Sequence, residues 1–150
     1  MLLRRDRTMT AVLIMLDIAF HAGRAGTVSA ADIAERAGLA RRGIEPLLQS
    51  LSRSALLESV RGPRGGYRLG RPRRDITLAD VVSVAAAAED APAEDGIGGG
   101  LFERVVEPAW KHLDDTLRAE LSRLTLDELV RRAEEAGLRR PLAEPISFSI

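Results

Sequence analysis

Apolar residues recur at spacings of three and four along the N-terminal third of the chain, the pattern of helices with one buried face. Helices are predicted over 8–22, from a cap at Ser29 to Gly38, and from about 41 to 54. Ser29 is suited to accept a hydrogen bond from a free first-turn amide, and Gly38 to adopt a left-handed C-terminal cap. We expect Pro46 in the first turn of the third helix, where a missing amide proton costs least. The very short turn between the second and third helices predicts a helix-turn-helix.

Two short strands are predicted next, over 56–60 and 67–69, on either side of a turn at 61–66 that is rich in Gly and Pro. Tyr67 and Leu69 fall on one face of the second strand. A small hairpin that follows a helix-turn-helix in this way is typical of a wing.

The C-terminal half is predicted to be helical. Capping boxes at 77–80 and 125–128 predict helices that end near residues 88 and 137. The segment 89–100 is acidic and rich in Gly, which indicates a flexible loop. Residues 101–124 form a long helix that Pro108 is expected to kink or restart.

Apolar residues of the long helix recur at near-heptad spacing, which is typical of a seam between helices. The expected dimerisation residues are Val106, Trp110, Leu113, Leu117 and Leu121. The predicted fold is mainly α, a winged helix-turn-helix with a two-stranded wing plus a long C-terminal dimerisation helix. Its parts are a DNA-binding domain at 1–88, a flexible loop at 89–100, a helical dimerisation region at 101–137 and a loose tail at 138–150.

Composition and charge narrow the class of protein. Aromatic residues make up only 3% of the chain, so aliphatic side chains must fill the core, which suits packed helices. The net charge is zero, yet residues 1–75 hold 14 Arg against 7 Asp and Glu, and residues 76–150 hold 8 Lys and Arg against 15. A basic half attracts a polyanion through counterion release. Uneven solvation of an ordinary surface is the alternative.

Several kinds of site are excluded or not expected. The chain has no cysteine, which excludes disulfides, thiolate nucleophiles and cysteine-ligated metal clusters. No apolar run approaches the roughly 18 residues of a membrane span, so we expect a cytoplasmic protein with no membrane partner. His21 and His112 lack companions at metal-ligand spacing. With no phosphate-binding loop and no nucleophile beside a base, neither a metal site nor an enzyme is expected.

The third predicted helix has a polar face that suits DNA. The major groove admits one helix, and there arginine pairs with guanine, glutamate with cytosine and glutamine with adenine. Residues 61–74 add six arginines and no acid around a Gly-Pro turn, which suits phosphates or a narrow minor groove. The predicted DNA-binding residues are Arg41, Arg42, Glu45, Gln49, Arg61, Arg64 and Arg68.

Other interpretations of these patterns stay open. Many αα-hairpins resemble a helix-turn-helix, and arginines at a hairpin tip can simply face water. The main alternative function is a winged-helix protein-interaction module that does not bind DNA. A small-molecule sensor pocket between the wing domain and the dimer helices also stays open, with its effector unknown.

The chain resembles the Rrf2 family of bacterial transcription regulators over roughly residues 8–85, and the later helix matches in pattern only. The resemblance rests on the segments 33–36, 61–67, Leu69 and 76–82, of which the Arg-Gly-Pro-Arg-Gly-Gly-Tyr wing is the most specific. It implies a homodimer that binds an imperfect palindrome in double-stranded DNA, and we expect a repressor. It also implies that Glu45 and Arg61 read bases from the recognition helix and the wing.

The sequence departs from the family pattern at three places. Ala40 stands where a Ser or Thr cap is common, and Gly43 stands where a Tyr is common. Well-known members hold an iron–sulfur cluster through three cysteines, and the corresponding stretch, about 91–104, has none. We therefore expect a cysteine-free member with no cofactor and with a DNA specificity of its own.

Overall fold

The computed structural model describes residues 7–23, 26–87 and 96–139. The fold is mainly helical with one two-stranded antiparallel sheet, as predicted. Most of the expected loop at 89–100 and of the tail at 138–150 lies outside the described residues. The elements are, in chain order, α1 (Arg7–His21), α2 (Ala30–Ala37), α3 (Arg41–Arg53), β1 (Leu57–Val60), β2 (Gly66–Leu69), the 3-10 turn η1 (Arg73–Asp75), α4 (Leu78–Ala87), the π-helical segment η2 (Phe102–Val106), α5 (Glu107–Arg123) and α6 (Leu126–Glu135).

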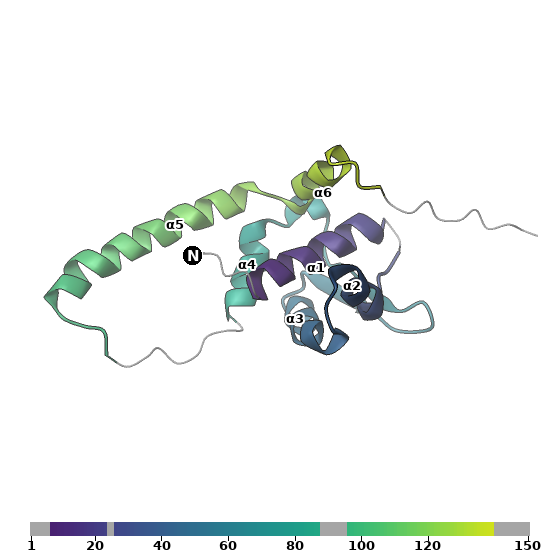
Figure 1. The fold of residues 1–150 in the computed structure, drawn as a ribbon, viewed down its shortest axis with the longest axis horizontal. Coiled ribbons are helices and arrows are strands. Elements are labelled where there is room, and N and C mark those ends of the chain that lie inside the picture. The colour runs from purple at the N-terminus through teal and green to yellow at the C-terminus, as the bar shows by residue number, and fades with distance from the viewer. Residues whose placement is uncertain (1–6, 24–25, 88–95, 140–150) are drawn as a thin grey trace, which may run out of the picture.

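Helix α1 forms the centre of the fold (Figure 1). Its side chains Ile14, Met15 and Ile18 are completely buried, and the helix packs against α2, α3, α4, α6 and β2. Burial of each such aliphatic side chain contributes about 1.5–3 kcal/mol. The chain has few aromatic residues, and it therefore builds its core from aliphatic side chains around this central apolar helix.

Local caps set the bounds of the helix-turn-helix. The Ser29 hydroxyl accepts a 3.1 Å hydrogen bond from the Asp32 amide at the start of α2. Gly38 ends that helix with a φ of 66°, which a glycine adopts without steric cost. The next amide, Leu39 N–H, then donates to the Ala34 carbonyl at 2.9 Å. Both predicted caps are confirmed, and they make the turn to α3 short and rigid.

Pro46 does not lie in the first turn of α3, and that prediction was wrong. The helix begins at Arg41, and the Gly43 amide already donates to the Ala40 carbonyl, so Pro46 falls in the second turn. A proline there cannot donate to the carbonyl four residues earlier, that of Arg42. Arg42 is exposed, so water can donate a hydrogen bond to this carbonyl in place of the missing amide, and the helix tolerates the proline.

The long C-terminal helix passes through a widened turn ahead of Pro108. Residues Phe102–Val106 are π-helical, and the Glu107 amide donates to the Phe102 carbonyl five residues earlier. A π turn provides the space that a proline ring and its missing amide require. Pro108 therefore neither ends nor restarts the helix, which continues to Arg123.

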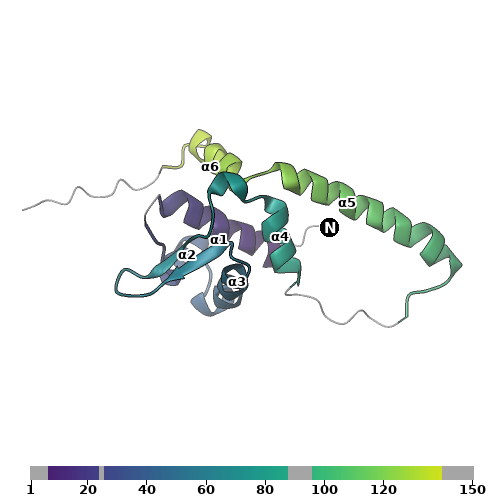
Figure 2. The same ribbon diagram turned by 180° about the vertical axis from the view of Figure 1, so that it is seen from behind.

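Helix α6 returns to the N-terminal part of the chain, whereas α5 projects away from it (Figures 1 and 2). Leu126 and Val130 of α6 belong to the same buried core as α1. Thr77 and Thr125 form an isolated antiparallel bridge, in which the Leu78 amide donates to the Leu124 carbonyl at 2.8 Å. The last helix, placed with the dimerisation region in the sequence-based division, thus shares a core with the winged helix. None of the described helices combines the length and apolarity needed to cross a membrane.

Candidate nucleic-acid interface

Helix α3 has one buried and one exposed face. Its apolar side chains Ile44, Leu47, Leu48 and Leu51 are buried against the core. The opposite face is exposed and carries four of the predicted DNA-binding residues, Arg41, Arg42, Glu45 and Gln49. The amphipathic pattern of the sequence therefore orients this polar face outward, as a recognition helix requires.

The wing is a short antiparallel hairpin with a tight tip. Its strands pair from Leu57 with Leu69 to Val60 with Gly66. At the tip, the Gly65 amide donates to the Gly62 carbonyl at 2.8 Å, and Gly62 has a φ of 114° that favours glycine. This turn presents Arg64 to solvent.

A third segment, not foreseen from the sequence, fixes the wing to the body. Val28, just ahead of α2, exchanges two backbone hydrogen bonds with Tyr67 of β2, at 2.9 and 2.8 Å. A Cβ atom at Gly66 would lie 2.5 Å from the Val28 carbonyl oxygen, so only glycine permits this approach. In addition, the Thr27 hydroxyl donates to the Arg64 carbonyl at 2.8 Å. The wing is thus held at a defined place beside the helix-turn-helix.

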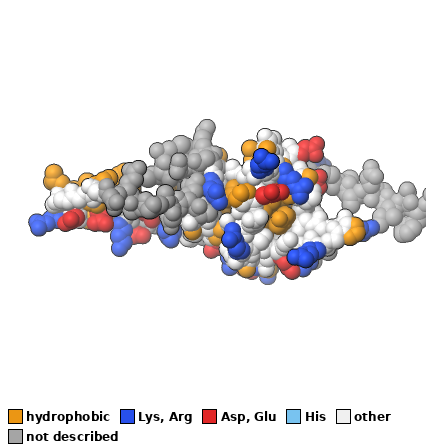
Figure 3. Space-filling model, turned by 90° about the horizontal axis from the view of Figure 1, so that it is seen from below, with side chains coloured by type: hydrophobic (Ala, Val, Ile, Leu, Met, Phe, Trp, Pro, Cys, Tyr) orange, Lys and Arg blue, Asp and Glu red, His pale blue; other side chains and the backbone are white. Residues whose placement is uncertain are grey.

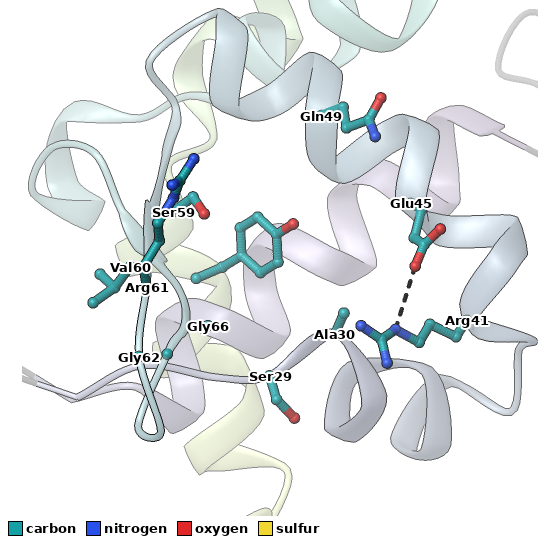
Figure 4. A pocket seen from close by; sticks show the side chains of 12 residues that line it. Ser29, Ala30, Arg41, Glu45, Gln49, Ser59, Val60, Arg61, Gly62 and Gly66 are labelled. Carbon is teal, nitrogen blue, oxygen red and sulfur yellow. Dashed lines mark ion pairs between the residues drawn. The ribbon is translucent and has the colours of Figure 1, made fainter.

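Helix α3 and the wing border one open groove, with a volume of about 530 Å³ (Figure 4). Arg41, Glu45 and Gln49 line it from α3, and Arg61 lines it from the wing. Ser29, the N-terminal cap of α2, also lines it. The sequence indicated Ser29 only as a cap, although the start of the first helix in such a motif is a natural neighbour of DNA phosphates. Four predicted residues from two distant segments therefore meet at one surface.

Arg41 and Glu45 form an ion pair within this groove, with 3.3 Å between Arg41 Nε and Glu45 Oε1 (Figure 4). The two side chains are one helical turn apart and largely exposed. Such a pair contributes only about 0.3–0.5 kcal/mol. Its partners can therefore separate at low cost and turn toward bases.

The remaining predicted residues, Arg42, Arg64 and Arg68, do not line the groove. Arg42 and Arg64 are exposed on α3 and at the wing tip. Arg68 Nε donates to Glu58 Oε2 across the hairpin at 2.9 Å. This contact lowers the pKa of Glu58 and raises that of Arg68. Arg68 is therefore already engaged within the wing.

The arginines of the segment 61–74 are not left without acids, although the segment contains none before Asp75. Four of them have carboxylate partners that other parts of the chain or the next residue supply: Arg68 with Glu58, Arg71 with Asp80, Arg73 with Asp127, and Arg74 with Asp75. Among the described residues, Arg61 and Arg64 have no such partner. Seen from below, basic side chains surround the face of the folded body, with hydrophobic and acidic ones among them (Figure 3).

The predicted dimerisation stripe lies on α5 and η2, away from the groove. Trp110 is 62% exposed, Leu113 45% and Val106 44%, whereas Leu117 and Leu121 are half-buried. Hydrophobic side chains are visible at the α5 end of the molecule, at the left in Figure 3. A single chain thus leaves much of this apolar stripe in contact with water.

Comparisons with known proteins agree with this geometry. The model of the family described as "Rrf2: Iron-dependent Transcriptional regulator" matches residues 5–132. The HTH-type transcriptional regulator IscR of Escherichia coli is 39% identical over 126 residues, which cover 83% of this chain and 77% of that protein. The solved structure of T. potens IscR has a TM-score of 0.72 at 31% identity and covers 93% of this chain and 94% of its own. CymR (YrzC), the global cysteine regulator of B. subtilis, has a TM-score of 0.69 at 27% identity and covers 88% and 98%.

These similarities extend over the winged helix and the long helix α5 together. The relatives are transcription regulators and not enzymes. The resemblance seen in the wing and in the segments around it is therefore confirmed along most of the chain. This chain belongs to the Rrf2 family of transcriptional regulators.

Proposed function

We propose that the protein is a homodimeric repressor that binds an imperfect palindrome in double-stranded DNA and acts in the cytoplasm. The observation that carries this proposal is the groove shared by α3 and the wing, where Arg41, Glu45, Gln49 and Arg61 lie together. A helix that enters the major groove and a wing beside it would each meet the same DNA face.

The residues have distinct roles in this proposal. Glu45 accepts a hydrogen bond from a cytosine amino group, and Arg61 reads a base from the wing. Arg41, Arg42 and Gln49 contact bases or phosphates along α3. Arg64 at the exposed wing tip supplies charge to the phosphate backbone or the minor groove. Arg68 acts indirectly, because its bond to Glu58 ties the two wing strands together.

The exposed apolar stripe on η2 and α5 supports the proposed dimer. Val106, Trp110 and Leu113 repeat at near-heptad spacing, and each is at least 44% exposed in the single chain. A second copy packed on this stripe, together with the half-buried Leu117 and Leu121, would remove it from water. Because such a dimer is two-fold symmetric, it presents two identical DNA-binding surfaces and favours a palindromic site.

The residues of this chain do not fit a cysteine-ligated iron–sulfur cluster, although the family is described as iron-dependent. The chain has no cysteine. Among the residues described, no three His, Asp or Glu side chains are grouped so that they could hold a metal ion. We propose that this member senses its signal without such a cluster.

Selection from random duplexes followed by fluorescence anisotropy tests the proposal. The selected palindrome should bind at least about 10³-fold more tightly than random duplex at physiological salt. Arg61→Ala and Glu45→Ala should each lose about 1–3 kcal/mol of discrimination at one base pair, whereas Arg64→Ala should weaken binding to all sequences and reduce the salt dependence. Arg123→Ala, on the exposed surface of α5, is the matched control.

Equal affinity for selected and random duplexes would refute the proposal. If Arg61→Glu and Arg64→Glu also leave the capture of a protein partner unchanged, the protein is better explained as a winged-helix interaction module that does not bind DNA. Sedimentation equilibrium tests the dimer separately, since Trp110→Ala should shift the population toward the monomer if the stripe is the seam.

A further inference from the structure

A second hollow lies behind the wing, with a volume of about 730 Å³. Its floor includes Ala19 of α1, Ala22 just after that helix, and Leu69 of β2. Its rim carries four arginines and one acid, which come from the base of the wing, from η1 and from the first turn of α6: Arg68, Arg71, Arg73, Arg74 and Asp127. Of the predicted DNA-binding residues, Arg68 alone lines it.

The rim retains most of its hydrogen-bonding capacity. Each guanidinium has five N–H donors, and the ion pairs engage one nitrogen of each: Arg71 Nη2 with Asp80 at 3.3 Å, Arg73 Nε with Asp127 at 2.6 Å, and Arg74 Nε with Asp75 at 4.0 Å. Arg74 is 79% exposed and its pair is the longest of the three. The rim can therefore bind a further anion without any of these arginines losing its own partner.

The shape and chemistry together suit one class of ligand. An apolar floor accepts a compact hydrocarbon body, and a rim of planar guanidiniums recognises a carboxylate or phosphate. We propose that this hollow is an effector site for a small organic anion with an apolar body and a carboxylate or phosphate group.

The hollow is placed to influence the DNA-binding groove. Within the four residues of β2, Gly66 and Tyr67 line the groove, whereas Arg68 and Leu69 line the hollow. The Arg73–Asp127 pair joins the chain after the wing to α6, which is close to the end of α5 (Figure 2). A ligand on the rim would contact the base of the wing and the start of α6 together, and this shared contact is the route by which we propose that it alters DNA binding. This coupling to DNA rests on the function proposed above, but binding in the hollow does not.

Phenyl phosphate is a suitable probe, because it combines a phosphate dianion with an aromatic ring. In ¹H–¹⁵N spectra of the full chain, it should shift the amides of Ala22, Leu69 and Arg71 saturably at millimolar concentration. Inorganic phosphate at equal ionic strength should bind more weakly, because it leaves the apolar floor empty. Binding of phosphate with equal strength would overturn the proposed organic ligand.

Two variants separate a ligand site from a set of structural ion pairs. Arg71→Gln with Arg74→Gln should weaken binding about tenfold, as loss of charge-assisted hydrogen bonds predicts. Asp127→Asn should strengthen it about fivefold, because it removes a negative charge from the rim. Arg123→Gln, which breaks an exposed arginine–glutamate pair elsewhere, should have no effect. If the rim arginines serve only as structural ion pairs, phenyl phosphate should give no saturable shifts. Equal affinity for phenyl phosphate in the double variant and in Asp127→Asn would also overturn the ligand site.

Anisotropy with the selected palindrome tests the coupling. Phenyl phosphate should change the DNA affinity of the natural protein at least about threefold, and it should not change that of the double variant. Saturable binding without a change in DNA affinity would overturn the effector role and leave the anion site standing. A protein that binds no selected DNA, yet still binds phenyl phosphate, would refute the proposed function alone.

Discussion

Replacement of Leu126 by alanine tests the placement of α6 in the core. Leu126 is completely buried, and its amide donates to the Ile76 carbonyl at 3.0 Å. The substitution removes three carbon atoms, worth about 0.8 kcal/mol each on transfer, and leaves a cavity among packed side chains. We expect the free energy of unfolding to fall by about 3 kcal/mol, and the melting temperature by about 10 °C.

Leu138→Ala provides a matched control for this experiment. It is the same chemical change shortly after the end of α6, at a side chain that is 59% exposed. It should cost no more than about 0.5 kcal/mol. Both variants should be melted by circular dichroism at one protein concentration, since dimerisation makes the melting temperature depend on concentration. If the two variants melt at the same temperature, α6 does not share the core with α1.

Three other predictions concern local features. Gly66→Ala should destabilise the protein by about 1–3 kcal/mol in chemical denaturation, because its Cβ meets backbone rather than a movable side chain. Gly43→Ala, in α3 with open space around it, should instead stabilise by about 0.4–1 kcal/mol. The Glu58–Arg68 bond depresses the pKa of Glu58 below its ordinary 4.5. The stabilisation of the folded protein by this bond should therefore be fully present above the ordinary pKa of Glu58, and it should disappear as the pH falls through the lowered pKa. A carboxyl NMR titration measures this, and Glu58→Gln should abolish the dependence.

Local features of the fold could be predicted from the sequence because their causes are local. The caps at Ser29 and Gly38 depend on residues within one turn of them. The wing tip depends on glycines that accept unusual backbone angles. Pro46 was misplaced by one turn although the helix begins at Arg41, as predicted, because the sixth residue of a helix already lies in its second turn.

Contacts between distant segments could not be predicted in this way. The bridge between Val28 and Tyr67 joins residues about 40 positions apart, and a single residue at Val28 carries no strand pattern. The acid-free run at 61–74 gave no indication of the carboxylates that its arginines meet in the fold. Its partners include Asp127, which is distant in sequence and comes near only because α6 returns to α1.

The family, the order of the elements and the polar face of the recognition helix can be read from neighbouring residues, because periodicity, caps and the wing motif are local properties of the chain. The absence of cysteine likewise excludes a cysteine-ligated cluster. The groove shared by α3 and the wing, the completion of the core by α6, and the pairing of individual arginines became apparent in the folded chain alone. These outcomes depend on how buried faces pack together, and packing joins residues whose separation along the chain carries no signal of their contact.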